Sequence, residues 1–192
     1  PTATSGCTNL LKSVKSCMLK TGPMIGKLQD HTEGRLMIKE VAAYIAGFLD
    51  GDGSLMFQIK KRKDGKSKIR FMLTICFYQD SKHDKPLYWI RKILKIGYIS
   101  KRKDGITELR INGFRQVREI LKNLIPFIKF KRKQAKAMYV SANLLGRVKK
   151  SDLSDKNLHD LANYILIIQN NNYATKKKKT KKDLLKILGL TP

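Results

Sequence analysis

The spacing of apolar and polar residues divides the first half of the chain into a helix and a hairpin. Apolar residues recur every three or four positions over 38–50, which predicts a helix over these residues that Gly51 and Gly53 terminate. Apolar and polar residues then alternate over 54–60 and again over 68–78, which predicts two strands. Asp64-Gly65 between these strands is a hairpin signal. Each strand therefore has one apolar face and one polar, largely basic face.

Further elements follow in the same way. The pattern predicts a helix over 81–95 with Ser81 as its cap, and a second hairpin, 97–103 and 106–112, around Asp104-Gly105. It also predicts helices over 114–123, 132–145, 155–170 and 181–188. The fold class is therefore α+β, with the order α-β-β-α-β-β-α and further C-terminal helices. The polar faces of the two hairpins can merge into one saddle-shaped antiparallel sheet.

The charge of the chain indicates a nucleic-acid partner. The 192 residues include 41 Lys and Arg against 15 Asp and Glu, a formal charge of +26. Residues 41–150 hold 27 of the basic and 8 of the acidic residues, so the most regularly patterned segment is also the most basic. Solubility requires far less charge than this, so a polyanion is the expected partner. Composition does not distinguish a binding protein from an enzyme.

Domain organisation and cellular context follow from composition. We expect an N-terminal extension over 1–37, a core over 38–146 and a basic helical extension over 147–192. The first 29 residues are basic and free of acids, typical of an organelle transit segment, although a tail or a DNA-skirting arm has the same composition. No apolar run approaches the ~18 residues of a membrane-spanning helix. Three scattered cysteines indicate a reducing compartment.

Two acids stand between glycines where the first helix meets the first strand. Asp50-Gly51-Asp52-Gly53 brings carboxylates and backbone carbonyls to one point, and hard divalent cations such as Mg²⁺ prefer these oxygens. On spacing alone, a helix-terminal turn whose acids serve solubility remains an alternative. The neighbouring Ala42, Ala46 and Gly47 are small enough to let a second helix approach closely.

Residues 45–53, Ile-Ala-Gly-Phe-Leu-Asp-Gly-Asp-Gly, resemble the LAGLIDADG motif of homing endonucleases. The similarity extends to the order of elements across 38–146, to Leu73-Thr74 with Gln79 on the second strand, and to the segment 126–131 before the last core helix. Together these features resemble the single-motif, homodimeric branch that mobile introns encode, often in chloroplast genes of algae. The resemblance implies organelle localisation, with the chloroplast preferred over the mitochondrion.

The resemblance also implies roles for individual residues. Asp52 matches the metal-binding catalytic carboxylate, and the Gly51 carbonyl a neighbouring ligand. Gln79 matches a residue that positions water, and Lys131 a basic residue that stabilises charge on the scissile phosphate. His83 stands where relatives carry an arginine, so its role is open and Lys82 could replace it. Mg²⁺ is the expected cofactor; Mn²⁺ or Ca²⁺ could occupy the same site, Ca²⁺ without turnover.

A single motif and no internal repeat predict a homodimer, because one motif carboxylate is too few for a shared metal centre that cuts both strands of a duplex. The expected dimer contacts come from Ala42, Ala46, Gly47 and Asp50. A ten-residue strand spans about one turn of B-DNA, so a dimer would follow a target of about 20 base pairs of double-stranded DNA.

The polar face of the predicted sheet is the expected DNA-binding surface, because arginine and lysine suit guanine and glutamine suits adenine. Its expected members are Ser54, Met56, Gln58, Lys60, Lys68, Arg70, Met72, Thr74, Cys76, Tyr78, Ser100, Arg102, Glu108 and Arg110. The lysine run 176–179 is expected near phosphates rather than at a specific site.

Two other functions fit the same residues. An intron maturase would hold structured RNA on the same basic saddle. A repressor-like protein would bind DNA without cutting it. The acidic pair Asp50 and Asp52 argues for cleavage, since a pure RNA binder gains nothing from acids near phosphates.

Overall fold

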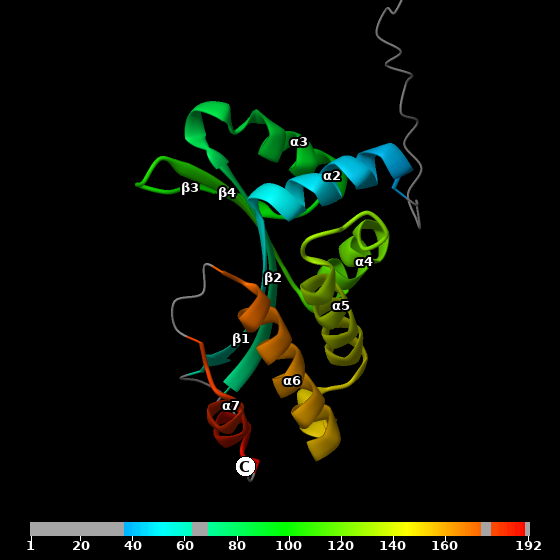
Figure 1. The fold of residues 1–192 in the computed structure, drawn as a ribbon, viewed down its shortest axis with the longest axis vertical. Coiled ribbons are helices and arrows are strands. Elements are labelled where there is room, and N and C mark those ends of the chain that lie inside the picture. The colour runs from blue at the N-terminus through cyan, green and yellow to red at the C-terminus, as the bar shows by residue number, and fades with distance from the viewer. Residues whose placement is uncertain (1–36, 63–68, 174–177, 191–192) are drawn as a thin grey trace, which may run out of the picture. The chain divides into compact units, whose positions relative to one another are not determined.

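A computed structural model describes residues 37–62, 69–173 and 178–190, all within the compact unit Leu36–Pro192. Residues 1–36 of the predicted extension over 1–37 lie outside the described residues, as do the Asp64-Gly65 turn, Lys68, Lys176 and Lys177. The elements follow in the order α2 (Lys39–Asp52), β1 (Gly53–Lys61), β2 (Ile69–Asp80), η1 (Ser81–His83), α3 (Lys85–Leu94), β3 (Tyr98–Lys101), β4 (Ile106–Asn112), α4 (Phe114–Leu124), α5 (Arg132–Arg147), η2 (Lys150–Asp152), α6 (Asp155–Asn171) and α7 (Lys181–Leu188) (Figure 1). The predicted α+β order is therefore confirmed.

The four strands form one antiparallel sheet in the order β1-β2-β4-β3, so the two hairpins join through β2 and β4. Side chains of one parity, such as Leu55, Ile75 and Leu109, are fully buried. They form one continuous core with residues of the helices, including Ile45 and Met138. Burial of this face supplies the main driving force for folding and leaves the polar parity of the sheet on the other side.

The expected helix over 81–95 is interrupted, and Ser81 is not its cap. The Asp80 carboxylate accepts a hydrogen bond from the Lys82 backbone N–H and caps the short helix η1. The Ser81 hydroxyl instead shares a hydrogen bond of 2.8 Å with the Thr107 hydroxyl on β4. Helix α3 then begins as a separate helix, with Pro86 in its first turn. Proline is tolerated there, because backbone N–H groups of the first turn have no partner within the helix. The Ser81–Thr107 hydrogen bond therefore connects the segment just after β2 to β4.

The C-terminal helices pack into the same core as the sheet. Leu161 of α6 and Leu184 of α7 are almost fully buried. The Asn172 side chain, just after α6, donates to the backbone carbonyl of Leu55 at 2.8 Å and so covers part of the free edge of β1. No described helix is both long and apolar enough to cross a membrane.

Candidate active site and nucleic-acid interface

Helix α2 runs into strand β1 with no connecting loop. A side chain at Gly53 would place its Cβ 2.6 Å from the Leu49 carbonyl oxygen, so only glycine fits at the junction. The helix extends through Gly51 and Asp52, two residues past the predicted end. Asp52 is therefore the last residue of α2, exposed, and adjacent to the first residue of the sheet.

The other motif acid, Asp50, is engaged inside the chain. Its carboxylate accepts hydrogen bonds from three consecutive backbone N–H groups, those of Lys129 (2.6 Å), Phe130 (3.1 Å) and Lys131 (3.0 Å). A carboxylate with several backbone donors forms strong, charge-assisted bonds. Asp50 thus fastens the segment before α5 to the end of α2. Its predicted place among the dimer contacts stays a prediction.

Lys131 reaches the same point from a distance of about 80 positions along the chain. Its ammonium donates to the carbonyl oxygens of Asp50 (2.5 Å) and Gly51 (3.4 Å), and the residue is only 8% exposed. Burial lowers the pKa of Lys131, whereas the charges of Asp50 and Asp52 act in the opposite direction. Three predicted site residues, Gly51, Asp52 and Lys131, therefore meet at the end of α2.

Gln79 and His83 stand apart from this group in the hydrogen-bonding pattern. The Gln79 side-chain oxygen accepts from the neighbouring backbone N–H of Asp80 at 2.9 Å. His83 is exposed at the end of η1. Within the described part of the chain, neither side chain forms a hydrogen bond to Asp52 or Lys131. Their predicted catalytic roles stay predictions.

The end of α2 offers the oxygen ligands that a divalent cation requires, but not a complete set. Asp52 contributes an exposed carboxylate, and the Gly51 carbonyl lies beside it. No group of three His, Cys, Asp or Glu side chains gathers anywhere in the described residues. A hard cation needs about six ligands. Among the described residues, this point therefore offers one exposed carboxylate and a backbone carbonyl, fewer ligands than a hard cation needs.

Cross-strand rows order the polar face of the sheet. Ser54, Cys76, Arg110 and Tyr98 lie opposite one another on successive strands. The neighbouring rows are Met56, Thr74 and Asn112 on one side and Tyr78, Glu108 and Ser100 on the other, with the pairs Gln58–Met72 and Lys60–Arg70 further along the first hairpin. Of the predicted DNA-binding residues, Lys60, Arg70 and Arg102 are exposed, and Ser54, Met56, Gln58, Met72, Tyr78, Ser100 and Arg110 are partly exposed.

Three predicted DNA-binding residues are buried instead. Thr74 is 1%, Cys76 0% and Glu108 6% exposed. They lie on the two central strands, β2 and β4, each of which has a neighbouring strand on both sides. Burial raises the pKa of the Cys76 thiol and also that of the Tyr78 hydroxyl. These three side chains are too enclosed to contact a base directly, which corrects their assignment.

Two residues of the polar face escaped the sequence-based assignment. Tyr98 begins β3 opposite Arg110 and is 49% exposed. Asn112 ends β4, is exposed, and accepts a hydrogen bond of 2.6 Å from the Thr74 hydroxyl. Tyr98 has the same parity as the predicted DNA-binding residue Ser100, and Asn112 the same parity as Arg110. The alternation of apolar and polar positions could therefore have identified both. Their places at strand ends obscured that signal.

Helix α2 also presents an outward stripe of small residues. Ala43, Gly47 and Gly51 are exposed at helical spacing, and a Cβ at Gly47 would meet nothing within 4 Å. The predicted contact residues Ala42 and Ala46 are 2% and 0% exposed and lie in the core of the chain. Their side chains are not available to a partner, which corrects that part of the prediction. Gly47 keeps its predicted position on the surface.

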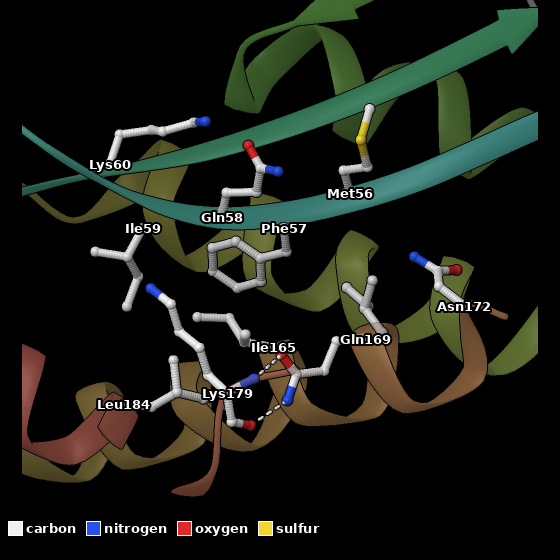
Figure 2. A pocket seen from close by; sticks show the side chains of 11 residues that line it. Met56, Phe57, Gln58, Ile59, Lys60, Ile165, Gln169, Asn172, Lys179 and Leu184 are labelled. Atoms are coloured by element: carbon white, nitrogen blue, oxygen red, sulfur yellow. Dashed lines mark hydrogen bonds between the residues drawn. The ribbon is translucent and has the colours of Figure 1, made fainter. Parts of the chain in front are cut away.

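A pocket lies beside the free edge of β1, between that strand and the C-terminal helices (Figure 2). Phe57 and Ile59 point into it from the strand, Ile165 from α6 and Leu184 from α7. The Gln169 amide pairs with the backbone of Lys179 through two hydrogen bonds and places this lysine in the pocket wall. Lys179 is therefore attached to α6, beside the edge of β1.

Comparisons with known proteins agree with this geometry. The model of the LAGLIDADG endonuclease family matches residues 45–138. DNA endonuclease I-CvuI of Chlorella vulgaris is 35% identical over 94 residues, 49% of this chain and 58% of the relative. DNA endonuclease I-CreI of Chlamydomonas reinhardtii is 32% identical over 100 residues, 50% of this chain and 59% of the relative. The matches thus span less than two thirds of these relatives.

A solved structure shows the same architecture. The crystal structure of the homing endonuclease I-CvuI in complex with its target, in the presence of Ca, has a TM-score of 0.65 to this chain at 26% identity. The match covers 80% of this chain and 98% of that one. Residues 45–138 therefore resemble the LAGLIDADG endonuclease family, and the fold of the chain is that of a homing endonuclease.

Proposed function

We propose that this protein is a site-specific endonuclease that cuts double-stranded DNA as a homodimer, with a divalent metal ion as cofactor. The observation that carries the proposal is the meeting of Asp52, the Gly51 carbonyl and Lys131 at the end of α2, next to the polar face of the sheet. A DNA-contacting sheet beside a carboxylate and an ammonium is suited to phosphodiester hydrolysis. The formal charge of +26 supports a polyanionic substrate.

Each residue has a distinct task in this proposal. Asp52 and the Gly51 carbonyl would hold a cation, for which Mg²⁺ is the proposed choice; when bound, it stabilises negative charge on the phosphate and lowers the pKa of a bound water. Lys131 would direct its ammonium at the scissile phosphate and stabilise the charge that develops there. Asp50 fixes Lys131 by holding its backbone N–H and that of its two predecessors. Gln79 and His83 are proposed to orient water around the site.

The homodimer follows from the incomplete metal site and the outward stripe of α2. Two copies related by a two-fold axis would bring two Asp52 carboxylates together across the stripe of Ala43, Gly47 and Gly51. Close helix approach requires small side chains there, and those three positions are alanine or glycine. Two sheets side by side would then follow a target of about 20 base pairs.

The relatives support the substrate and the setting. I-CvuI and I-CreI are DNA endonucleases of two algae, and I-CvuI has been crystallised with its target. We extend this to an intron-encoded protein of an organelle, with the chloroplast as the proposed location. No described feature favours the maturase alternative.

The test is incubation of the full chain with double-stranded DNA of the intron's host gene in its intronless form. In Mg²⁺ we expect a single double-strand cut at the intron insertion site. With a chelator we expect no cleavage. Ca²⁺ in place of Mg²⁺ is expected to allow binding without turnover. Specific binding without cleavage in Mg²⁺ or Mn²⁺ would indicate a repressor-like protein, and binding of structured intron RNA alone would indicate a maturase.

A further inference from the structure

Glu108 is an anion in the middle of a surface proposed to face DNA. It lies on β4, on the polar parity of the sheet, with Tyr78 and Ser100 as its cross-strand neighbours. A carboxylate close to phosphates is electrostatically unfavourable, and a side chain 6% exposed cannot reach a base. Glu108 therefore has a role on this face other than direct contact with DNA.

The contacts of Glu108 supply that explanation. The Arg110 guanidinium donates from Nη2 to the Glu108 carboxylate at 2.8 Å, and the Cys76 sulfur lies 3.9 Å from the other carboxylate oxygen. The Glu108 side chain is 8% exposed and that of Arg110 is 32% exposed, so the pair runs from the interior of the sheet to its surface. The hydrogen bond that Arg110 donates to Glu108 raises the pKa of Arg110.

The position of Arg110 is unusual for an arginine on a protein surface. Its Nε is buried and has no hydrogen-bond partner among the described residues, so the base of the guanidinium is enclosed in the sheet. A free arginine would rotate to satisfy that donor, because an unmade buried hydrogen bond is costly. The carboxylate holds the group in this orientation instead, with the exposed part of the side chain toward the open face.

We propose that Glu108 is a positioning residue for base recognition, whose buried carboxylate fixes the Arg110 guanidinium so that Arg110 reads one guanine in each half of the target. This rests on the proposed function, since it assumes that the polar face contacts duplex DNA. An arginine held in one orientation favours the two acceptors of guanine in the major groove over the acceptor and donor of adenine. The orientation, rather than the charge, provides the discrimination.

The proposal predicts that Glu108→Gln changes affinity and specificity in opposite directions. Removing a negative charge from the DNA-facing surface strengthens binding to duplexes of any sequence. Loosening the Arg110 guanidinium weakens the preference for guanine at its own position. A merely structural Glu108 would lower the affinity for every duplex and leave relative base preferences unchanged.

The experiment selects bound sequences from a randomised duplex DNA library in Ca²⁺, with the full chain. Wild type, Arg110→Ala, Glu108→Gln and the double variant are compared, and mixed-sequence duplex measures nonspecific affinity. We expect Arg110→Ala to remove a guanine preference at one position per half-site, and Glu108→Gln to reduce that same preference about fivefold or more. In the Arg110→Ala background, Glu108→Gln should change no preference, because the two residues act through one contact.

Glu119→Gln is the matched control, because Glu119 is an exposed glutamate of α4 bonded to Arg118 and away from the polar face. It makes the same charge change and should alter no base preference. A Glu108→Gln variant whose guanine preference equals that of wild type overturns the inference while the proposed function stands. A wild type that enriches no sequence overturns the proposed function, and the role of Glu108 with it. Thermal unfolding of each variant confirms that the folded proteins are compared.

Discussion

The end of α2 and the polar face of the sheet differ in what holds their side chains in place. At the end of α2, Asp50 and Lys131 form hydrogen bonds to backbone groups, so the geometry depends little on the neighbouring side chains. On the sheet, Thr74 bonds Asn112 and Glu108 bonds Arg110, so side chains orient other side chains. The arrangement at the end of α2 is suited to a reaction that is the same for every phosphate. On the polar face, substitutions in one cross-strand row can alter the preferred bases and leave the other rows unchanged.

The largest effect is expected for a substitution of Asp52, which should reduce cleavage much more than DNA binding. Asp52→Asn should lower the cleavage rate at least about a hundredfold, because an amide is a poor ligand for Mg²⁺ and the nearby Asp50 carboxylate is bonded to the backbone of 129–131. Binding of the same duplex should stay within about tenfold of wild type, or about 1.4 kcal/mol. Cleavage and binding are measured on one labelled duplex, in Mg²⁺ and Ca²⁺ respectively. Substantial cleavage by this variant would remove Asp52 from the catalytic site.

The second prediction concerns the small-residue stripe of α2. Gly47→Leu should weaken dimerisation at least about tenfold, because overpacking a close helix contact costs about 1–3 kcal/mol. The side chain has free space in the single chain, so the monomer itself should accept it. Gly47→Ala should even stabilise the monomer by about 0.5–1 kcal/mol, since glycine is unfavourable inside a helix.

Sedimentation velocity of the free protein and of its DNA complex measures the effect at Gly47. Thermal unfolding shows whether each variant is folded. A Gly47→Leu protein that remains as dimeric as wild type would place the interface elsewhere than on this stripe.

The third prediction tests the link between Asp50 and Lys131. Asp50→Ala leaves three backbone N–H groups without their carboxylate, which should lower the free energy of unfolding by about 1–2 kcal/mol. It should also reduce cleavage, because Lys131 loses its support. Asp152→Ala is the control: its exposed carboxylate accepts from Ser151, and surface changes of this kind stay within about 0.5 kcal/mol. Equal stability of the two variants in chemical denaturation would contradict the structural role of Asp50.

The fold could be predicted from the sequence because periodicity reports directly on burial. The alternation over 68–78 and the helical spacing over 38–50 both match the observed elements within a few residues. The patterns did not reveal which polar side chains are covered. Cys76 and Glu108 have the parity of exposed residues, yet their place on central strands buries them. That outcome depends on strand order, β1-β2-β4-β3, which alternation does not encode.

The candidate site, like the fold, could be predicted from the sequence only in part. The motif and the resemblance identified Gly51, Asp52 and Lys131, which the structure brings together. They gave no indication that Asp50 bonds the backbone before α5, because a carboxylate next to a helix end has many possible partners. The burial of Ala42 and Ala46 was also missed, since small residues suit both a core and a helix–helix contact.

The fourth prediction tests which residues of the sheet read sequence. Arg70 is exposed at the far end of the first hairpin, opposite Lys60. Arg70→Ala should cost about 1–3 kcal/mol at one target position and relax the base preference there. Arg91→Ala on α3 removes an equal charge from an exposed position of a helix and should change no preference. Binding to a panel of single-base variants measures both, and a uniform loss in Arg70→Ala would assign Arg70 to phosphates.

The smallest effect is expected at the sheet edge, where Gln169 holds the backbone of Lys179 beside β1 (Figure 2). If Lys179 contacts a phosphate, Lys179→Ala should weaken binding to all sequences alike and reduce the slope of log affinity against log salt by about one. Gln169→Leu should reproduce part of this loss with no change of charge, because it releases the backbone that carries the lysine. Lys156→Ala, an exposed lysine in the first turn of α6, is the matched control. An unchanged salt slope in Lys179→Ala would show that this edge of the sheet lies beyond the DNA.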